Sequence, residues 1–206
     1  MSKKTEQSRI AYNKIAASYD TSREGVYTRF HIRELLDTID LRDGDVVLDV
    51  GCGPGTLLGE LSKKARIRAN GIDLSEGMIR AAGIRCPAGN FQAGPCCPLP
   101  WGEESVDIIT VCCAFHHFDT PLEFARECRR VLRERGSVYL ADPWFGPVTR
   151  LLANALWCPL SRSGDVRIYS GRELEELFRR AGFEAVAVYR KGPGLFLRAR
   201  KRQDPL

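Results

Sequence analysis

Three glycines follow a short apolar run in the first third of the chain. Residues 45–50 predict a buried strand, and Gly51, Gly53 and Gly55 come directly after it at every second position. Glycines between a strand and a helix let backbone N–H groups approach a ligand with no side chain in the way. A dinucleotide-binding loop needs a glycine at its sixth position, where this chain has Thr56. The spacing predicts a binding loop for a ligand other than NAD, with a plain tight turn as the alternative.

A carboxylate stands at the end of the next predicted strand. Residues 67–72 form that strand, and Asp73 follows it. Parallel strands bring their carboxyl ends to one edge of a sheet, where an ionised carboxylate can accept hydrogen bonds from both hydroxyls of a ribose. Asp73 is therefore a candidate ribose-binding residue. The alternative is a charge that stabilises the N-terminus of the helix that Ser75 is expected to cap.

Two of the three histidines are adjacent and follow a further predicted strand at residues 106–111. His116 and His117 lie where side chains would face a ligand at the same sheet edge. An imidazole can remove a proton near neutral pH, which an oxygen or activated carbon acceptor would need. Both histidines are candidate catalytic residues, and the alternative is a loop element that serves packing.

The eight cysteines are predicted to be free thiols, because no export signal precedes them and no Cys-x-x-Cys pair has zinc-ligand spacing. No metal site with standard spacing is expected. Two adjacent pairs, Cys96 with Cys97 and Cys112 with Cys113, should nevertheless lie at the ligand edge of the sheet. We consider that these thiols converge on a soft ion or metalloid, or exchange with a thiol substrate. The alternative is that they fill the core as small apolar side chains.

Strands and helices alternate from residue 45 onward, which indicates a layered α/β fold with crossover helices. Residues 55–64, the segment after Ser75, and the segments after Thr120 and Ser170 predict helices, the last two with capping boxes that end in Glu123 and Glu173. Further strands are expected around Phe91 and at residues 137–142. Residues 183–190 and 195–200 predict a final antiparallel hairpin.

Two pieces fall outside this alternation, a helical stretch at residues 1–40 and an insert at 143–169. Segments placed after strands are natural covers for a site at the carboxyl edge of a sheet. The insert is rich in Leu and Trp over residues 144–160, which favours an apolar or aromatic ligand. The alternative is that its apolar face serves only packing.

Composition limits the protein class. A chain of 206 residues with 44% hydrophobic and 28% charged residues is predicted to be one domain, residues 1–206. The net charge of +5 is too mild to predict nucleic-acid binding, since nucleic-acid binders combine a stronger excess with a recognisable motif. The longest apolar stretch, 151–160, is too short to span a bilayer, and the start lacks an apolar signal run. We expect a cytoplasmic protein without a membrane span.

The order of these motifs resembles class I S-adenosylmethionine-dependent methyltransferases, in particular the small-molecule branch with the ubiquinone and menaquinone C-methyltransferases (methyltransferase type 11 domain). The resemblance is carried by residues 11–20, 47–55, 71–75, 99–101 with 105–107, 115–118 and 173–183. It implies a Rossmann-like, seven-stranded, mainly parallel sheet with helices on both faces, one antiparallel strand near the C-terminus and an N-terminal helical cover.

The resemblance also implies S-adenosyl-L-methionine as cofactor and a role for each matching residue. Asp49 and the glycine loop would face the methionine part, Asp73 the ribose, and Leu74 and Met78 the adenine. Cys112, at the end of its strand, would line the open side of the cofactor. Tyr19 resembles a tyrosine that closes the N-terminal cover, with Tyr12 assisting; the alternative for Tyr19 is an ordinary helix aromatic.

One position departs from the family pattern. Where relatives place an acidic residue against the adenine amino group, this chain has Pro95. Proline has no side-chain acceptor and no backbone donor, so adenine would be held by the backbone or by Cys96, and more weakly.

Methyl transfer from a sulfonium is an in-line displacement that depends mainly on holding the acceptor close and aligned, so few catalytic side chains are needed. For this reason the sequence predicts a small-molecule acceptor without naming it, and leaves open O-, N-, S- or C-methylation and the oligomeric state. Two alternatives remain: a cofactor-binding protein without catalysis, and a nucleic-acid methyltransferase, suggested by residues 142–145 although the motif follows the wrong strand.

Overall fold

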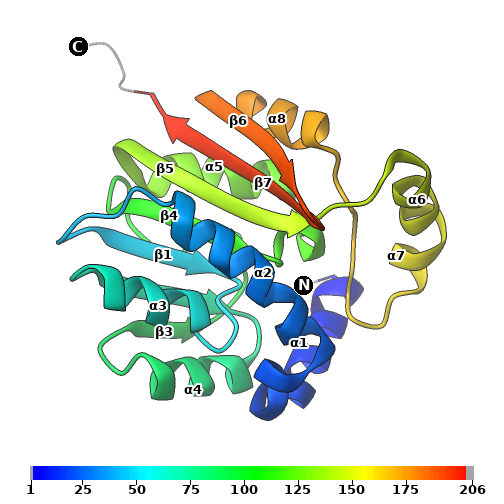
Figure 1. Cartoon of the computed structure of the whole chain (residues 1–206), viewed down its shortest axis with the longest axis horizontal. Helices are drawn as coiled ribbons and strands as arrows, with labels where there is room; N and C mark the ends of the chain where they lie inside the picture. Colours follow the sequence, from blue (N-terminus) through cyan, green and yellow to red (C-terminus); the bar gives the residue numbers. More distant parts are fainter. Residues whose placement is uncertain (1, 203–206) are drawn as a thin grey trace.

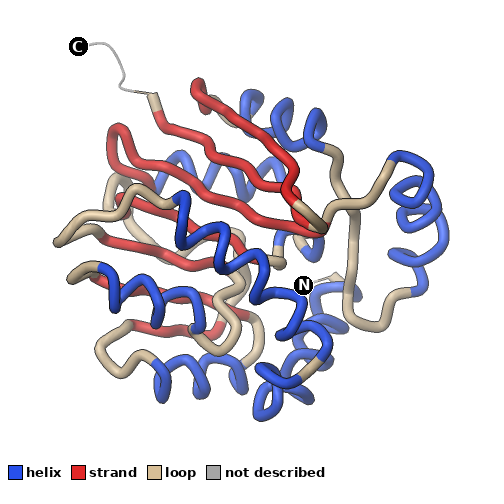
Figure 2. The backbone as a smooth tube through the Cα atoms, viewed as in Figure 1, coloured by secondary structure: helices blue, strands red, loops and turns tan. Residues whose placement is uncertain are grey.

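Seven strands form one sheet in the computed structural model, which describes residues 2–202 (Figures 1 and 2). The strands are β1 (Val46–Val50), β2 (Arg68–Asp73), β3 (Asn90–Ala93), β4 (Val106–Cys112), β5 (Leu132–Pro143), β6 (Phe183–Lys191) and β7 (Gly194–Lys201). Their order across the sheet is β3-β2-β1-β4-β5-β7-β6, with β7 antiparallel to both neighbours and the pairs from β3 to β5 parallel. The predicted fold class is confirmed.

Helices cover both faces of the sheet (Figure 1). One layer consists of α2 (Arg23–Thr38), α3 (Thr56–Lys64) and α4 (Glu76–Arg85), and the other of α5 (Pro121–Val131) and α8 (Gly171–Arg180). Leu35 and Leu58 pack on one face of the sheet, while Phe124 and Phe178 pack on the other. All five residues of β1 are buried, because a parallel strand between two helical layers has no face toward water.

Helix starts follow the predicted signals, with one exception. Ser75 accepts a hydrogen bond from the Met78 N–H, and Ser170 forms the expected capping box with Glu173. The capping box expected at Thr120 is wrong, since its side chain makes no capping hydrogen bond. The backbone there (φ −124°, ψ 64°) departs from the extended conformation that Ser170 adopts (φ −85°, ψ 163°), so the hydroxyl is not directed at the helix.

Two segments outside the sheet meet beside its carboxyl edge (Figure 1). The N-terminal segment contains α1 (Lys3–Ile15) and η1 (Ala16–Thr21), and the insert contains α6 (Pro147–Leu152), the π-helical turn η3 (Ala153–Trp157) and α7 (Cys158–Leu160). The Lys4 ammonium donates to the carbonyls of Cys158, Pro159 and Ser161 at 2.5, 3.2 and 3.0 Å. This contact joins the two segments.

Among the described residues, none of the helices combines the length and the apolar character that crossing a lipid bilayer requires.

Candidate active site

A cavity of about 480 Å³ lies at the carboxyl ends of β1, β2, β3 and β4, beneath α1 and η1. Ten of the residues predicted for the site line it: Tyr19, Gly51, Gly53, Asp73, Leu74, Met78, Pro95, Cys96, Cys112 and His117. Three others, Asp49, Gly55 and His116, do not. The volume falls within the range of small-molecule pockets.

The glycine loop forms one wall of the cavity. Gly51, Gly53 and Gly55 all have positive φ, at 71°, 51° and 75°. A residue with a side chain would be strained in this backbone conformation. A Cβ on Gly51 would lie 2.4 Å from the Cβ of Ala114, whereas a Cβ on Gly53 would meet nothing within 4 Å. Gly53 therefore faces free space, and Gly55 serves instead as the residue before α3, close to Ala82.

Asp73 is held at the end of β2 by backbone donors. Its two carboxylate oxygens accept hydrogen bonds from the N–H groups of Gly53 and Ser75, each at 2.9 Å. Burial raises the pKa of this carboxyl, and the two backbone hydrogen bonds oppose the shift. Asp73 thereby fixes the glycine loop and still presents acceptor lone pairs to the cavity it lines.

Asp49 lies behind the loop, in β1. Its side chain is 2% exposed and accepts a hydrogen bond of 2.7 Å from the Thr110 hydroxyl. Burial raises the pKa of Asp49 to about 7, with the Thr110 hydrogen bond opposing and the charge of Asp73 adding to the shift. Such a carboxyl gains its charge most readily when a positive ligand group approaches.

The far end of the cavity has an apolar lining. Leu74, Met78, Pro95 and Cys96 lie here, at the ends of β2 and β3 and in α4. Burial raises the pKa of the Cys96 thiol to about 12, so this group is a neutral, weak hydrogen-bonding side chain. The acid that the family resemblance led us to expect at position 95 has no replacement among these four side chains.

The two histidines differ in surroundings and in charge. His116 is 7% exposed, and its Nδ1 lies 2.8 Å from Asp142 Oδ1 while its Nε2 lies 3.5 Å from Asp165 Oδ1. Burial alone would lower the pKa of His116, but the charge of Asp142, its hydrogen bond and the charge of Asp165 raise it to about 9. A protonated imidazole outside the cavity lining does not fit the predicted role of catalytic base.

His117 does line the cavity and is neutral, since burial and repulsion by His116 lower its pKa. Its Nε2 lies 3.0 Å from the hydroxyl of Tyr12. Tyr19 also lines the cavity, but its hydroxyl lies 3.2 Å from the Thr28 hydroxyl in α2. The tyrosine that reaches the loop after β4 is thus Tyr12, which the sequence analysis gave only an assisting role.

Hydrogen bonds near both ends of α1 hold the N-terminal segment over the cavity. Ser2 and Thr5 donate side-chain hydrogen bonds to Asp119. The amide oxygen of Asn13 accepts from the Ser75 hydroxyl at 2.7 Å and from the Gly77 N–H at 2.9 Å.

All eight cysteines are free thiols, as predicted. Four of them, Cys96, Cys97, Cys112 and Cys113, line the cavity. Within residues 2–202, no cysteine belongs to a close group of three or more metal-ligating side chains. Convergence of the thiols on a soft ion, one of the two interpretations of the sequence, is therefore not seen in this part of the chain. Cys113 has a positive φ of 51°, and hydrogen bonding by Cys112 and His31 outweighs burial and lowers the pKa of its thiol.

The apolar side chains of the insert do not line the cavity, so they do not indicate an apolar ligand as the sequence suggested. None of the cavity-lining residues comes from 144–160, and Leu151 and Leu160 are 69% and 80% exposed. The insert reaches the site through Asp165 instead, a residue with no sequence motif around it. Asp142, at the end of β5, was likewise unassigned to the site.

Known proteins have sequences similar to this chain. A family profile described as a methyltransferase domain matches residues 48–140. An uncharacterized 37.1 kDa protein in transposon TN4556 of Streptomyces fradiae is 32% identical over 75% of this chain and 48% of its own length. A demethylmenaquinone methyltransferase of Thermotoga maritima is 31% identical over 64% and 59%. The chain thus spans about half the length of these two relatives.

Among solved structures, a chain of the Haloferax volcanii complex between the Trm112 methyltransferase activator and a putative methyltransferase superimposes with a TM-score of 0.79. The match covers 93% of this chain and 98% of that chain at 20% identity, so it concerns the fold.

Proposed function

We propose that the chain is a class I S-adenosylmethionine-dependent methyltransferase, similar to the menaquinone methyltransferase family, and that it transfers a methyl group to a small-molecule acceptor with an aromatic or apolar body. The proposal takes residues 1–206 as one catalytic domain, with 1–40 and 143–169 as the segments beside its site. The observation that carries it is the single cavity that joins the glycine loop and Asp73 to His117 and Tyr12.

The residues present fit S-adenosylmethionine. Gly53 leaves the space that a Cβ would fill, and Asp73 offers a carboxylate to a ribose diol beside it. Asp49 supplies a buried carboxyl whose ionised form favours a cation nearby. When bound, the cofactor supplies an activated methyl group on a positively charged sulfur.

The acceptor end of the cavity contributes positioning of the acceptor. Tyr12, Tyr19 and Phe118 present aromatic side chains there, which suits a flat acceptor. Burial and repulsion by His116 lower the pKa of His117 to about 3, so this imidazole is neutral and can orient an acceptor by a hydrogen bond, but it is a weak base at neutral pH. His116 has its two ring nitrogens directed at carboxylates, so its role is to hold the loop that carries His117.

Two alternative functions have less support. For a nucleic-acid methyltransferase, Asp142 would have to reach a flipped base, but it is 3% exposed and paired with His116. A cofactor-binding protein without catalysis is suggested only by Pro95, which concerns affinity for adenine and leaves the acceptor end intact.

Two measurements test the proposal. Calorimetric titration with S-adenosylmethionine and S-adenosylhomocysteine, with NADH as control, should give micromolar binding to the wild type and at least a tenfold weaker affinity for Asp73→Ala. Labelled methyl transfer is then measured to a naphthoquinol, a hydroxynaphthalene, an aromatic amine and transfer RNA. Methylation of one of the three small aromatic compounds supports the proposal. Cofactor binding with transfer only to RNA would contradict it.

A further inference from the structure

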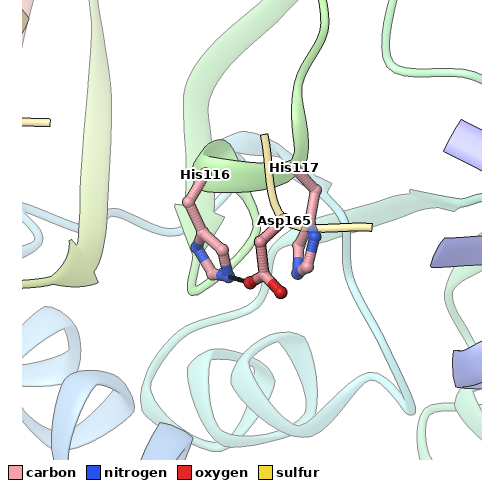
Figure 3. Close-up of side chains that lie close together, drawn as sticks. All are labelled: His116, His117 and Asp165. Carbon is pink, nitrogen blue, oxygen red and sulfur yellow. Dashed lines mark ion pairs between the residues drawn. The ribbon is translucent and has the colours of Figure 1, made fainter. Parts of the chain in front are cut away.

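Three side chains that come from two distant parts of the chain meet beside the acceptor end of the cavity. His116 and His117 belong to η2 (Phe115–His117), and Asp165 belongs to the end of the insert. One ligand atom from each residue lies within 4.8 Å of the others. The two imidazoles flank the carboxylate of Asp165, one on either side (Figure 3).

One pair of these atoms, on His116 and Asp165, has the spacing of two ligands around one ion. Imidazole nitrogen and carboxylate oxygen bind zinc at roughly 2.0 to 2.2 Å, so two such ligands at a tetrahedral angle lie about 3.4 Å apart. The distance between His116 Nε2 and Asp165 Oδ1 is 3.5 Å, which exceeds an ordinary hydrogen bond for such a pair. Two nitrogens and one oxygen are a donor set that suits zinc, cobalt or nickel.

The surrounding contacts are those of a supported metal site. Asp142 Oδ1 accepts from His116 Nδ1 at 2.8 Å, which directs Nε2 toward Asp165 and matches the outer carboxylate that metal-bound histidines usually have. The Ser161 hydroxyl donates to the other oxygen of Asp165. The side chains of His116 and Asp165 are only 8% and 16% exposed, so bulk water does not compete strongly for them.

We propose that His116, His117 and Asp165 bind one divalent transition-metal ion of the zinc class. Binding releases the proton of His116 Nε2 to solvent, since the metal takes the lone pair. Tyr12, whose hydroxyl lies 3.0 Å from His117 Nε2, marks the side on which the ion meets the cavity, and its hydrogen bond to this nitrogen is given up when Nε2 binds the ion. An acceptor hydroxyl or carbonyl oxygen is the ligand for the remaining coordination position. This last role rests on the proposed function, whereas metal binding itself does not.

The test is a cobalt titration of chelator-stripped protein, followed by visible absorption, with zinc added afterwards as competitor. We expect one equivalent of cobalt, strong d–d absorption of a tetrahedral site, no thiolate charge-transfer band, and displacement by zinc. Asp165→Asn and His117→Gln should each weaken cobalt binding at least tenfold. The control is Asp43→Asn, which should not weaken it, because Asp43 is an exposed carboxylate paired with Arg66. Circular dichroism confirms the fold of each variant, and His117→Gln serves if Asp165→Asn does not fold.

Absence of cobalt binding would overturn the proposal. So would a thiolate band, which would assign the metal to cysteines, or equal affinity in Asp165→Asn and Asp43→Asn. S-adenosylmethionine affinity is measured in parallel on the stripped protein. Cofactor binding without metal binding refutes the metal site alone, and metal binding without cofactor binding refutes only the proposed function.

Discussion

The hydroxyl of Tyr12 lies 3.0 Å from Nε2 of His117, and the two rings meet edge to face with centroids 5.4 Å apart. This pair connects α1 to the loop after β4 across the cavity. The N-terminal segment is therefore part of the wall of the site. The position of this segment and the position of His117 depend on each other.

A double-mutant cycle on this pair should show energetic coupling. Tyr12→Phe leaves His117 Nε2 without its hydroxyl partner, and a buried polar atom left unpaired costs about 1 to 3 kcal/mol. His117→Phe leaves the Tyr12 hydroxyl without its partner in the same way, whereas the double variant removes both polar groups. We expect the double variant to be at least ~0.5 kcal/mol more stable than the sum of the single losses predicts, measured by urea unfolding. Additive losses would show that the contact contributes nothing.

Alanine at two glycines of the binding loop should separate stability from binding. Both have positive φ, so each substitution costs about 1 to 2 kcal/mol in backbone strain. Gly51→Ala adds a contact of 2.4 Å with Ala114, which cannot be relieved by a flexible side chain, whereas Gly53→Ala adds no contact. We expect the larger fall in melting temperature for Gly51→Ala. Gly53→Ala should lower the melting temperature only by its backbone strain, and should lose cofactor affinity because its methyl group occupies cofactor space. Equal melting temperatures would refute this assignment.

An acid at position 95 should strengthen cofactor binding. Pro95 lines the apolar end of the cavity, at the position where the family resemblance implies a carboxylate for adenine. A hydrogen bond to a charged acceptor contributes about 1.5 kcal/mol or more, which is roughly a tenfold gain in affinity. Calorimetry on Pro95→Asp and on the control Pro95→Ala separates this gain from loss of the ring. If Pro95→Asp binds the cofactor no more tightly than Pro95→Ala does, position 95 does not contact adenine.

Asp49 should make stability depend on pH. Its folded pKa of about 7 lies above the usual value of 3.8, so the protonated form stabilises the folded state. That contribution is complete below about pH 4 and is lost at ~1.4 kcal/mol per pH unit as the pH rises toward 7, up to roughly 4 kcal/mol in all.

Asp49→Asn keeps an acceptor for Thr110 and cannot ionise. We expect the free energies of unfolding of the variant and the wild type to differ less at pH 5 than at pH 8. At pH 8 the variant should have the larger free energy of unfolding, measured with urea. Its affinity for S-adenosylmethionine should nevertheless fall. A wild type as stable as the variant at pH 8 would contradict the pKa assigned to Asp49.

Lys4→Met should loosen the insert. The substitution removes three hydrogen bonds from the ammonium to backbone carbonyls, of which the shortest is 2.5 Å to Cys158. Hydrogen bonds to charged groups contribute about 1.5 to 3 kcal/mol, so amide hydrogen exchange in residues 158–164 should quicken at least roughly tenfold. Lys3→Met is the matched control, as Lys3 is exposed. The same exchange rate in both variants would show that Lys4 does not hold the insert.

The sheet and the cofactor end could be predicted from the sequence because their signals are local. β1 is a continuous apolar run, the three glycines occupy positions with positive φ, and Asp73 ends the strand beside them. Each of these follows from a few neighbouring residues, and the order of strands follows from their alternation with helices.

The acceptor end could not be predicted in the same way, since it is built from residues that meet only after folding. Asp165 and His116 are 49 positions apart in the printed sequence, and no periodicity connects them. Tyr12 and Tyr19 are both aromatic residues of one segment, and only the path of α1 and η1 decides which of them reaches His117. Thr120 does not cap α5, although its motif predicts a cap, because the adjacent loop gives its backbone a conformation that directs the hydroxyl away from the helix.

The place of β7 has a consequence for how this protein is made. β7 leaves the ribosome after β5 and β6, yet it lies between them and pairs with both. A nascent chain that has not released residues 194–201 keeps the facing edges of β5 and β6 open, and open strand edges are the surfaces on which chains aggregate. The sheet therefore closes only after residues 194–201 have emerged, and chaperones that shield strand edges are needed most before that point.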